Sequence, residues 1–395
     1  MRILWHSCSP FCTSGYGMQT NQTTRWLRSQ GHDIAISAFF GVQGARADWG
    51  DIPIYPNNED NYGARRAIDW YQHWNADILM SLTDVWVLKD FDPKMRWYPW
   101  TPVDHNPIPP RVVSAIKDFK GFVKPIAMAR YGERELKRVG IDCYYVPHGI
   151  DCQMFAPLPK VRKEAREKLG WEDKFVVGTV ATNTLRKNWN AAMRAMQKFV
   201  KTHPRTVWYM HTTQYDNMGF NLHDARIAYE LHEHTFFPPD KELRIGIPQE
   251  TLRNAYNAMD VFLLPSKGEG FGLPSVEAQA CGVPVIISDN TAQTEMCGSG
   301  WLLKEQIPEY DLQDSFEFNC NSDEILQYLD EAYDKKKLGG MEEMRHKARL
   351  FALQYDAQKV FTEYWTPIMN DITEQIKTKG PAVEVNEKVA VKGDL

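Results

Sequence analysis

The sequence has no long hydrophobic run. No apolar stretch among its 395 residues approaches the ~20 residues that a helix needs to span a bilayer. The first residues, Met1 to His6, become polar too early for a signal peptide and are typical of a first β-strand. We therefore expect a cytoplasmic protein without a transmembrane segment.

The sequence is also poor in cysteine and has little net charge. Seven cysteines, an odd number without the spacing of a disulfide framework, are typical of a reducing compartment. The net charge is −5 at pH 7 and the pI is about 6.1. This balance supplies no excess of basic surface for a phosphate backbone, so nucleic acid is not an expected partner.

What the sequence does contain is the composition of a globular protein with two domains. Hydrophobic residues make up 43% and charged residues 25%, and the chain is longer than one ordinary core requires. Strand-like and helix-like segments alternate throughout, which predicts parallel α/β architecture. A connector rich in proline and glycine, residues 146–160, separates two sets of candidate strands. The first set is Ile3–Ser7, Ile34–Ala38, Ile78–Leu82, Trp97–Thr101, Phe122–Ala127 and Cys143–Val146, and the second is Phe175–Val180, Val207–His211, Thr235–Phe237, Val261–Leu264, Val285–Ile287 and Trp301–Leu303.

The most informative stretch runs from Leu263 to Gly282. A buried strand is predicted to end at Leu264, a glycine-rich loop follows, and Pro274 suits the first positions of a helix. The loop glycines allow a ligand to approach the main chain closely. Unpaired N–H groups and the helix dipole at this helix start favour an anion such as phosphate.

Two glutamates flank this predicted phosphate site. Glu269 lies in the loop and Glu277 inside the helix, and a buried carboxylate is costly without a partner. Neither can hold the phosphate itself, so we interpret both as acceptors for hydroxyl groups on either side of it, which is the layout of a sugar nucleotide. Two alternatives stay open: an ordinary strand-to-helix turn, and a glycosidase whose paired carboxylates flank the scissile bond.

The stretch Gly268–Ala278, Gly-Glu-Gly-Phe-Gly-Leu-Pro-Ser-Val-Glu-Ala, resembles the glutamate-pair motif of retaining GT-B glycosyltransferases of the family 4 type. Residues 280–287 and the residues from Leu252 to Val261 also match the pattern of that family. The resemblance implies an α/β fold of the GT-B class, with two Rossmann-like parallel-sheet domains that face a central cleft.

The resemblance also implies a division of the chain. Residues 1–150 would form the N-terminal, acceptor-side domain, and residues 151–350 the C-terminal domain that binds the donor. Residues 351–377 would form helices that return to the N-terminal domain. Residues 378–395 have no hydrophobic periodicity, and we expect a disordered tail there.

In this family the second domain binds the donor, and the resemblance assigns the roles. Glu277 would bind the ribose hydroxyls and Glu269 the hydroxyls of the transferred sugar. Lys187 and Arg186 would neutralise the diphosphate, although two adjacent cations on a loop are also typical of solvated surface charge. The remaining donor contacts would come from the main chain of Gly270, Phe271, Gly272 and Leu273.

One residue departs from the pattern of the family. Thr182 stands where the family has an arginine, whereas Lys187 aligns with the lysine of the family. Either Arg186 replaces the missing arginine, or the diphosphate is held more weakly.

The first domain contributes two candidate loops. Gly15 and Gly17 follow the first strand; they form either a tight structural turn or, as the resemblance implies, a loop that contacts donor phosphate or acceptor. Asp104 and His105 follow a strand end, where open α/β sheets bind ligands. A lone histidine is more often an ordinary loop residue, but the resemblance implies that His105 approaches the donor sugar and that Asp104 orients it or binds the acceptor.

The resemblance implies transfer of a sugar from a UDP- or GDP-sugar to an acceptor hydroxyl, with retention of anomeric configuration. Glu269, His105 and Lys187 would be the catalytic residues, acting mainly by electrostatic stabilisation. No obligatory cofactor or metal is expected, in line with the lack of an Asp-x-Asp cluster near the site. The acceptor, whether glycan, protein or small molecule, is not identified. A sugar-nucleotide epimerase of the same fold and a non-catalytic sugar-nucleotide binding protein remain alternatives.

Overall fold

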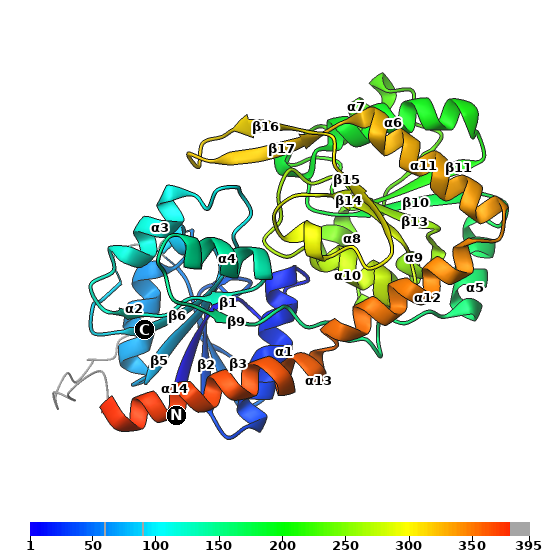
Figure 1. The fold of residues 1–395 in the computed structure, drawn as a ribbon. Coiled ribbons are helices and arrows are strands. Elements are labelled where there is room, and N and C mark those ends of the chain that lie inside the picture. Colours follow the sequence, from blue (N-terminus) through cyan, green and yellow to red (C-terminus); the bar gives the residue numbers. More distant parts are fainter. Residues whose placement is uncertain (59–60, 89–90, 380–395) are drawn as a thin grey trace.

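The protein is described here by a computed structural model that covers residues 1–58, 61–88 and 91–379. Two domains lie side by side, each built on a β-sheet with helices packed around it, and a two-stranded hairpin extends from the second domain towards the first (Figure 1).

The first domain has a nine-stranded sheet with the order β3-β4-β2-β1-β5-β6-β8-β9, and β7 pairs with β6. The central strand β1 pairs in parallel with β2 on one side and β5 on the other, so the order of the strands reverses at β1/β5. Its strands are β1 (Arg2–Cys8), β2 (Asp33–Phe40), β3 (Ala47–Trp49), β4 (Ile52–Pro56), β5 (Ile78–Leu82), β6 (Arg96–Thr101), β7 (Phe122–Val123), β8 (Ile126–Ala127) and β9 (Tyr144–Tyr145). Its helices are α1 (Gly15–Ser29), α2 (Ala64–His73), the 3-10 turn η1 (Val85–Val87), α3 (Pro110–Lys117) and α4 (Arg130–Arg138).

The second domain has a six-stranded parallel sheet with the order β12-β11-β10-β13-β14-β15, which reverses at β10/β13. Its strands are β10 (Phe175–Val180), β11 (Thr206–His211), β12 (Thr235–Phe236), β13 (Val261–Leu264), β14 (Val285–Ser288) and β15 (Gly300–Leu303). Its helices are α5 (Pro159–Leu169), η2 (Leu185–Lys187), α6 (Trp189–Thr202), α7 (Leu222–Ala228), α8 (Asp240–Ile245), α9 (Gln249–Ala258), α10 (Leu273–Ala280), η3 (Thr291–Glu295), α11 (Ser322–Lys337) and α12 (Met341–Ala352).

The central strands are continuous apolar runs because both of their faces are covered. All residues of β5, β13 and β14 are buried, as expected for parallel strands between two layers of helices. Every candidate strand of the sequence coincides with a strand of the structure.

The structure differs from the expected strands at three places. β3 and β4 form an antiparallel edge that the sequence did not indicate. The single strand expected over Phe122–Ala127 is divided into β7 and β8, because Pro125 has no N–H to continue the ladder. The third difference is the antiparallel hairpin of β16 (Gln306–Tyr310) and β17 (Phe316–Cys320), which the sequence analysis missed.

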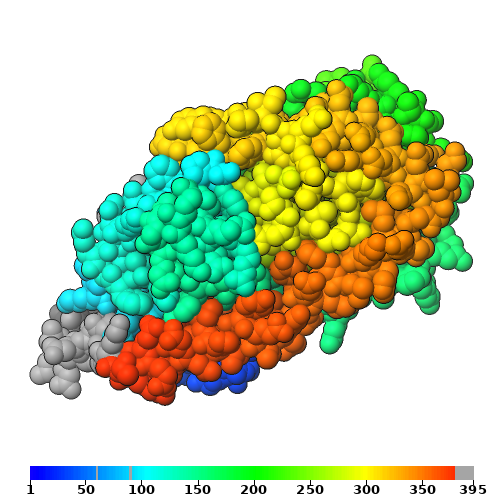
Figure 2. Space-filling model, viewed as in Figure 1, coloured from blue at the N-terminus to red at the C-terminus, as the bar shows by residue number. Residues whose placement is uncertain are grey.

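The C-terminal chain crosses back to the first domain after α12. It continues as η4 (Leu353–Tyr355), α13 (Ala357–Val360), a π-helical turn η5 (Phe361–Trp365) and α14 (Thr366–Lys379). Phe361 stacks on Trp26 at 5.0 Å between ring centroids, and Trp365 meets Trp100 edge-on at 5.1 Å. Figure 2 shows this orange and red segment lying along both domains. Residues 378 and 379 end α14, and the rest of the expected tail lies outside the described residues.

The fold bears on the expected lack of a transmembrane segment and of disulfides. Among residues 1–58, 61–88 and 91–379, no helix combines the length and the apolar character that a membrane crossing requires. All seven cysteines fall in these ranges, and each is a free thiol.

Candidate functional site

The loops that carry the candidate donor residues lie side by side at the edge of the second sheet. β10 and β13 are hydrogen-bonded neighbours at the point where strand order reverses. The loop after β10 carries Arg186 and Lys187, and the loop after β13 carries Glu269. In open α/β sheets, ligands bind at the carboxyl ends of the strands at such a point.

Glu269 holds the two cations of the neighbouring loop. Its Oε1 accepts from Lys187 Nζ at 2.5 Å, and its Oε2 accepts from Arg186 Nη1 at 3.0 Å. Burial by itself would raise the pKa of Glu269, but the two cations outweigh it and lower the pKa to about 2. Arg186 also donates to the carbonyl oxygen of Gly268. One carboxylate thus faces two cations, and the group keeps an excess of positive charge.

Glu277 is placed very differently, in the first turns of α10 with only 2% of its surface exposed. Its Oε2 accepts from the hydroxyl of Tyr256 at 2.8 Å. Its Oε1 is buried and has no hydrogen-bond partner among the described residues. Burial raises the pKa of Glu277 to about 7, which the Tyr256 hydrogen bond only partly offsets. One acceptor oxygen is thus left for a ligand.

The segment Gly270–Leu273 leads into α10 as expected, with Gly272 as N-cap in the left-handed region at φ 94°. Among the described residues, no protein acceptor takes the main-chain N–H groups of Gly270, Phe271 and Gly272. The side chain of Phe271 is buried edge-on against His148 at 5.1 Å and Tyr355 at 5.6 Å. The side chain of Phe271 therefore packs the loop against both segments that connect the two domains, while its main chain stays available to an anion.

Glycines allow the loop to touch the first domain. A Cβ placed on Gly268 would lie 2.0 Å from the carbonyl oxygen of Asp104, and one on Gly270 would lie 2.3 Å from Pro102 Cβ. Gly15 similarly faces Leu273, whose Cδ1 would be 3.1 Å from an added Cβ. Gly17 instead packs on the carbonyl of Cys12 in its own loop, so the structure brings only Gly15 to the second domain.

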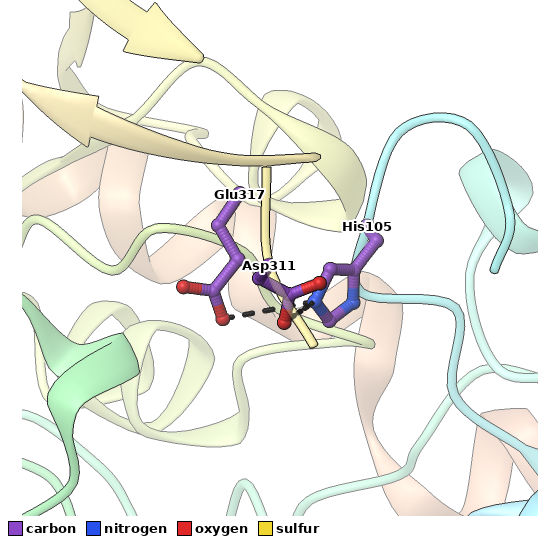
Figure 3. A group of neighbouring side chains, drawn as sticks. All are labelled: His105, Asp311 and Glu317. Carbon is purple, nitrogen blue, oxygen red and sulfur yellow. Dashed lines mark hydrogen bonds and ion pairs between the residues drawn. The ribbon is translucent and has the colours of Figure 1, made fainter. Parts of the chain in front are cut away.

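His105 is fully buried between Asp104 of its own domain and two carboxylates of the hairpin, Asp311 and Glu317, which Figure 3 shows beside the ring. Its Nδ1 lies 2.7 Å from Asp104 Oδ1, and its Nε2 lies 3.1 Å from Asp311 Oδ2. Glu317 Oε1 is 3.7 Å from the same Nε2. Burial by itself would lower the pKa of His105, but Asp104 and Asp311 outweigh it and raise the pKa. The hairpin thus supplies two site residues that the sequence analysis did not name.

The closeness of these three side chains is not by itself evidence of a metal site. One ligand atom each from His105, Asp311 and Glu317 lies within 4.8 Å of the others. The hydrogen bond between His105 and Asp311 accounts for their proximity without an ion. The expectation that no metal is required stays a prediction.

Two further acidic residues join the site at the edge of the first domain. Asp84 follows β5, next to the β6 strand end that carries Asp104, and burial together with the Asp104 charge raises the pKa of Asp84. Glu295, at the end of η3 in the second domain, accepts from the N–H groups of Arg130 and Tyr131 at the start of α4, at 3.0 and 2.6 Å. The strand-end rule could have found Asp84, whereas no local signal marks Glu295.

Thr182, which stands in place of the arginine of the family, is exposed. A cavity of about 440 Å³ lies elsewhere, between α6 and the base of the hairpin, and is lined by residues that include Arg194, Gln306 and Asn319. None of the candidate residues lines that cavity.

Part of the second domain matches a known protein family. Residues 161–306 match the family described as "Glycosyl transferases group 1". A protein of Sulfolobus islandicus rod-shaped virus 1 named "Uncharacterized glycosyltransferase 335" is 24% identical over 61% of this chain and 72% of its own length. A GDP-mannose-dependent phosphatidylinositol monomannoside mannosyltransferase of Mycolicibacterium smegmatis is 31% identical over 36% of this chain, but the chain spans only 37% of that relative.

Solved structures match over nearly the whole chain. A sucrose-phosphate synthase of Thermosynechococcus elongatus has a TM-score of 0.74 at 14% identity, covering 96% of this chain and all of its own. The Anabaena protein HepE in complex with UDP-glucose has a TM-score of 0.71 at 16% identity, with 96% of this chain and 100% of that chain covered. The expected GT-B architecture is confirmed. None of these proteins favours the epimerase or the non-catalytic alternative.

Proposed function

We propose that this GT-B protein, in which residues 161–306 match the glycosyl transferases group 1 family, transfers a sugar from a nucleoside diphosphate sugar to an acceptor hydroxyl with retention of anomeric configuration. The donor would bind at the β10/β13 edge of the second domain, and the acceptor would enter from the first domain. The proposal combines the resemblance of the Gly268–Ala278 motif to that of such enzymes with the contacts that the motif makes in this site.

The observation that carries the proposal is the buried, unpartnered Oε1 of Glu277. An unsatisfied buried acceptor costs free energy in the unliganded protein. A pair of ribose hydroxyls would satisfy it, and it lies on the helix whose start presents free N–H groups to an anion. A nucleotide needs an acceptor for its ribose hydroxyls next to a site for its phosphates, and this region offers both.

The diphosphate would bind to the cations that Glu269 now holds. A lysine ammonium has three donors and a guanidinium five, so Lys187 and Arg186 can bind phosphate oxygens while still contacting Glu269. The N–H groups of Gly270–Gly272 would add further donors. These groups are fixed before reaction, so they would stabilise the charge that develops on the leaving diphosphate.

Glu269 would then bind hydroxyls of the sugar and keep both cations oriented. The leaving phosphate would help to remove the proton from the acceptor hydroxyl, as the resemblance implies for retaining enzymes. The HepE complex contains UDP-glucose and the mycobacterial relative is named GDP-mannose-dependent, so UDP- and GDP-sugars are the donors to test first.

A thermal-shift screen against UDP- and GDP-sugars tests donor binding, because a ligand that binds only the folded state raises the melting temperature. The Glu269→Gln variant should bind the selected nucleotide within a few-fold of wild type but lose about tenfold or more of its turnover. Proton NMR of the anomeric signal in the product reports retention. Equal turnover in wild type and Glu269→Gln would contradict the assigned role.

A further inference from the structure

The hairpin β16–β17 belongs to the second domain but docks on the first. The N–H of Asn106 donates to the carbonyl of Phe316 at 3.2 Å. The Ser315 hydroxyl donates to the carbonyl of Pro107, and Arg111 donates to the carbonyl of Leu312. In Figure 1 the hairpin reaches from the second domain over α3. It therefore contacts the loop that carries His105.

The other end of the hairpin is tied to the donor loop. The Phe318 N–H donates to the carbonyl of Lys267 at 2.9 Å, and the ammonium of Lys267 pairs with Glu309. Lys267 is two residues before Glu269. The family match ends at residue 306, where the hairpin begins. The donor loop thus lies within the matched residues, whereas the hairpin beyond Gln306 lies outside them.

The hydrogen bonds of His105 define its charge. Both ring nitrogens face carboxylate oxygens, at 2.7 Å to Asp104 and 3.1 Å to Asp311. A neutral imidazole has one donor nitrogen and one acceptor nitrogen. In that form the lone pair of the acceptor nitrogen would face a lone pair of a carboxylate oxygen, which is repulsive. The imidazolium cation donates at both and satisfies both carboxylates.

We propose that Asp311 is a positioning residue that holds His105 as an oriented imidazolium, and that it does so only when the hairpin is docked on the first domain. The inference rests on the proposed function. His105 adjoins the donor loop, because Asp104 contacts Gly268 through its carbonyl and lies 3.8 Å from Arg186 Nε. The cation would therefore be in place beside the donor only in the closed arrangement of the two domains, which limits loss of the sugar to water.

The charges around His105 determine the pH dependence. Asp104 and Asp84 of the first domain and Asp311 and Glu317 of the hairpin favour the cation, and Arg186 of the second domain opposes it. The carboxylates prevail and raise the pKa of His105. Activity that needs the cation persists below this pKa and is lost as the pH rises through it. Removing the Asp311 charge should start that loss at a lower pH.

The Asp311→Asn variant tests the proposal with little change in shape. Asp311 Oδ1 accepts from the N–H of Gln313 at 2.9 Å, and an asparagine oxygen can keep that turn. We expect kcat to fall about tenfold, KM for the donor to stay within about twofold, and the alkaline limb of the pH profile to move to lower pH. A ¹⁵N NMR titration of the His105 ring should show a lower pKa. Glu317→Gln should have a smaller effect, because Glu317 is 3.7 Å from Nε2.

The control is Asp314→Asn in the same turn, whose carboxylate is exposed and faces the Tyr310 hydroxyl. It should match wild type in rate and in pH profile. An Asp311→Asn enzyme with the wild-type rate and pH profile, or an unchanged His105 titration, would overturn the proposal. If wild type transfers no sugar from any nucleotide sugar, the proposed function fails, while the titration still decides whether Asp311 holds the cation.

Discussion

Two glutamates eight positions apart in the sequence have opposite environments in this site. Glu269 is paired with Lys187 and Arg186, and its pKa falls to about 2. Glu277 has only the Tyr256 hydroxyl, and burial raises its pKa to about 7. Carboxylates whose environments separate their pKa values can take different roles: Glu269 is a fixed charge, and under the proposed function Glu277 would be an acceptor that a ligand completes.

The first prediction concerns Glu277→Gln. Gln keeps the shape but replaces one acceptor oxygen with a donor, so we expect nucleotide affinity to fall about tenfold or more, measured by calorimetry. The opposite effect is expected on stability without ligand. Because the folded-state pKa lies above the ordinary 4.5, wild type loses stability as the pH rises from about 4.5 through about 7, by about 3 kcal/mol.

The variant carries no such titration. In urea unfolding without nucleotide it should be more stable than wild type at pH 8 and similar to it at pH 5. An equal difference at both pH values would contradict the account of Glu277.

A second prediction concerns the diphosphate. Lys187→Ala should weaken binding of the nucleoside diphosphate about tenfold or more, through loss of a charge-assisted hydrogen bond. It should leave binding of the corresponding nucleoside unchanged. Lys201→Ala, an exposed lysine on α6, is the control and should affect neither ligand. Loss of nucleoside affinity in Lys187→Ala would indicate damage to the fold and not to a phosphate contact.

At the scale of elements, the site depends on the loop after β13 and on the β16–β17 hairpin. The sequence predicts the loop but not the hairpin. The strand, glycine loop and helix from Val261 to Ala280 could be predicted because each signal is local: β-formers, glycines, and a proline near the helix start. The hairpin was missed because its residues are almost all exposed or only half-buried, so its strands form no buried apolar run. It is held by contacts to Pro107, Arg111 and Lys267, which no local pattern reports.

The third prediction concerns the loop. In Gly270→Ala the added Cβ would lie 2.3 Å from Pro102 Cβ, so the loop could not approach the first domain without a shift. We expect a folded protein that binds nucleotide but loses about tenfold or more of its turnover, with a larger radius of gyration in small-angle scattering. Gly132→Ala in α4, whose Cβ would meet nothing closer than 3.5 Å, should behave as wild type in both measurements.

At the scale of the whole molecule, the C-terminal chain fastens the two domains together. The bridge between Ile150 and Asp356 pairs the outgoing and returning crossings. Beyond it, Trp365 is 1% exposed and packs on Trp100 of the first domain. The core of the first domain is therefore completed by residues more than 200 positions later in the chain.

The fourth prediction follows from this packing. Trp365→Ala should lower the free energy of unfolding by about 3–5 kcal/mol, because a large buried ring is replaced by a cavity. Urea unfolding followed by circular dichroism measures the loss. Leu338→Ala, at a side chain that is 84% exposed, should change stability by less than about 0.5 kcal/mol. Similar stabilities for the two variants would mean that Trp365 of η5 is not part of the first-domain core.

The sequence by itself determined the alternation of strands and helices and pointed to the stretch that we propose binds the donor. It could do so because the glycine loop, the helix start and both glutamates lie within one short stretch. Only the tertiary structure decided the protonation of the site residues. Glu269 meets Lys187 across 82 positions, and His105 meets Asp311 across 206. Protonation depends on burial and on neighbouring charges, and both are set by residues that the fold, not the local sequence, brings together.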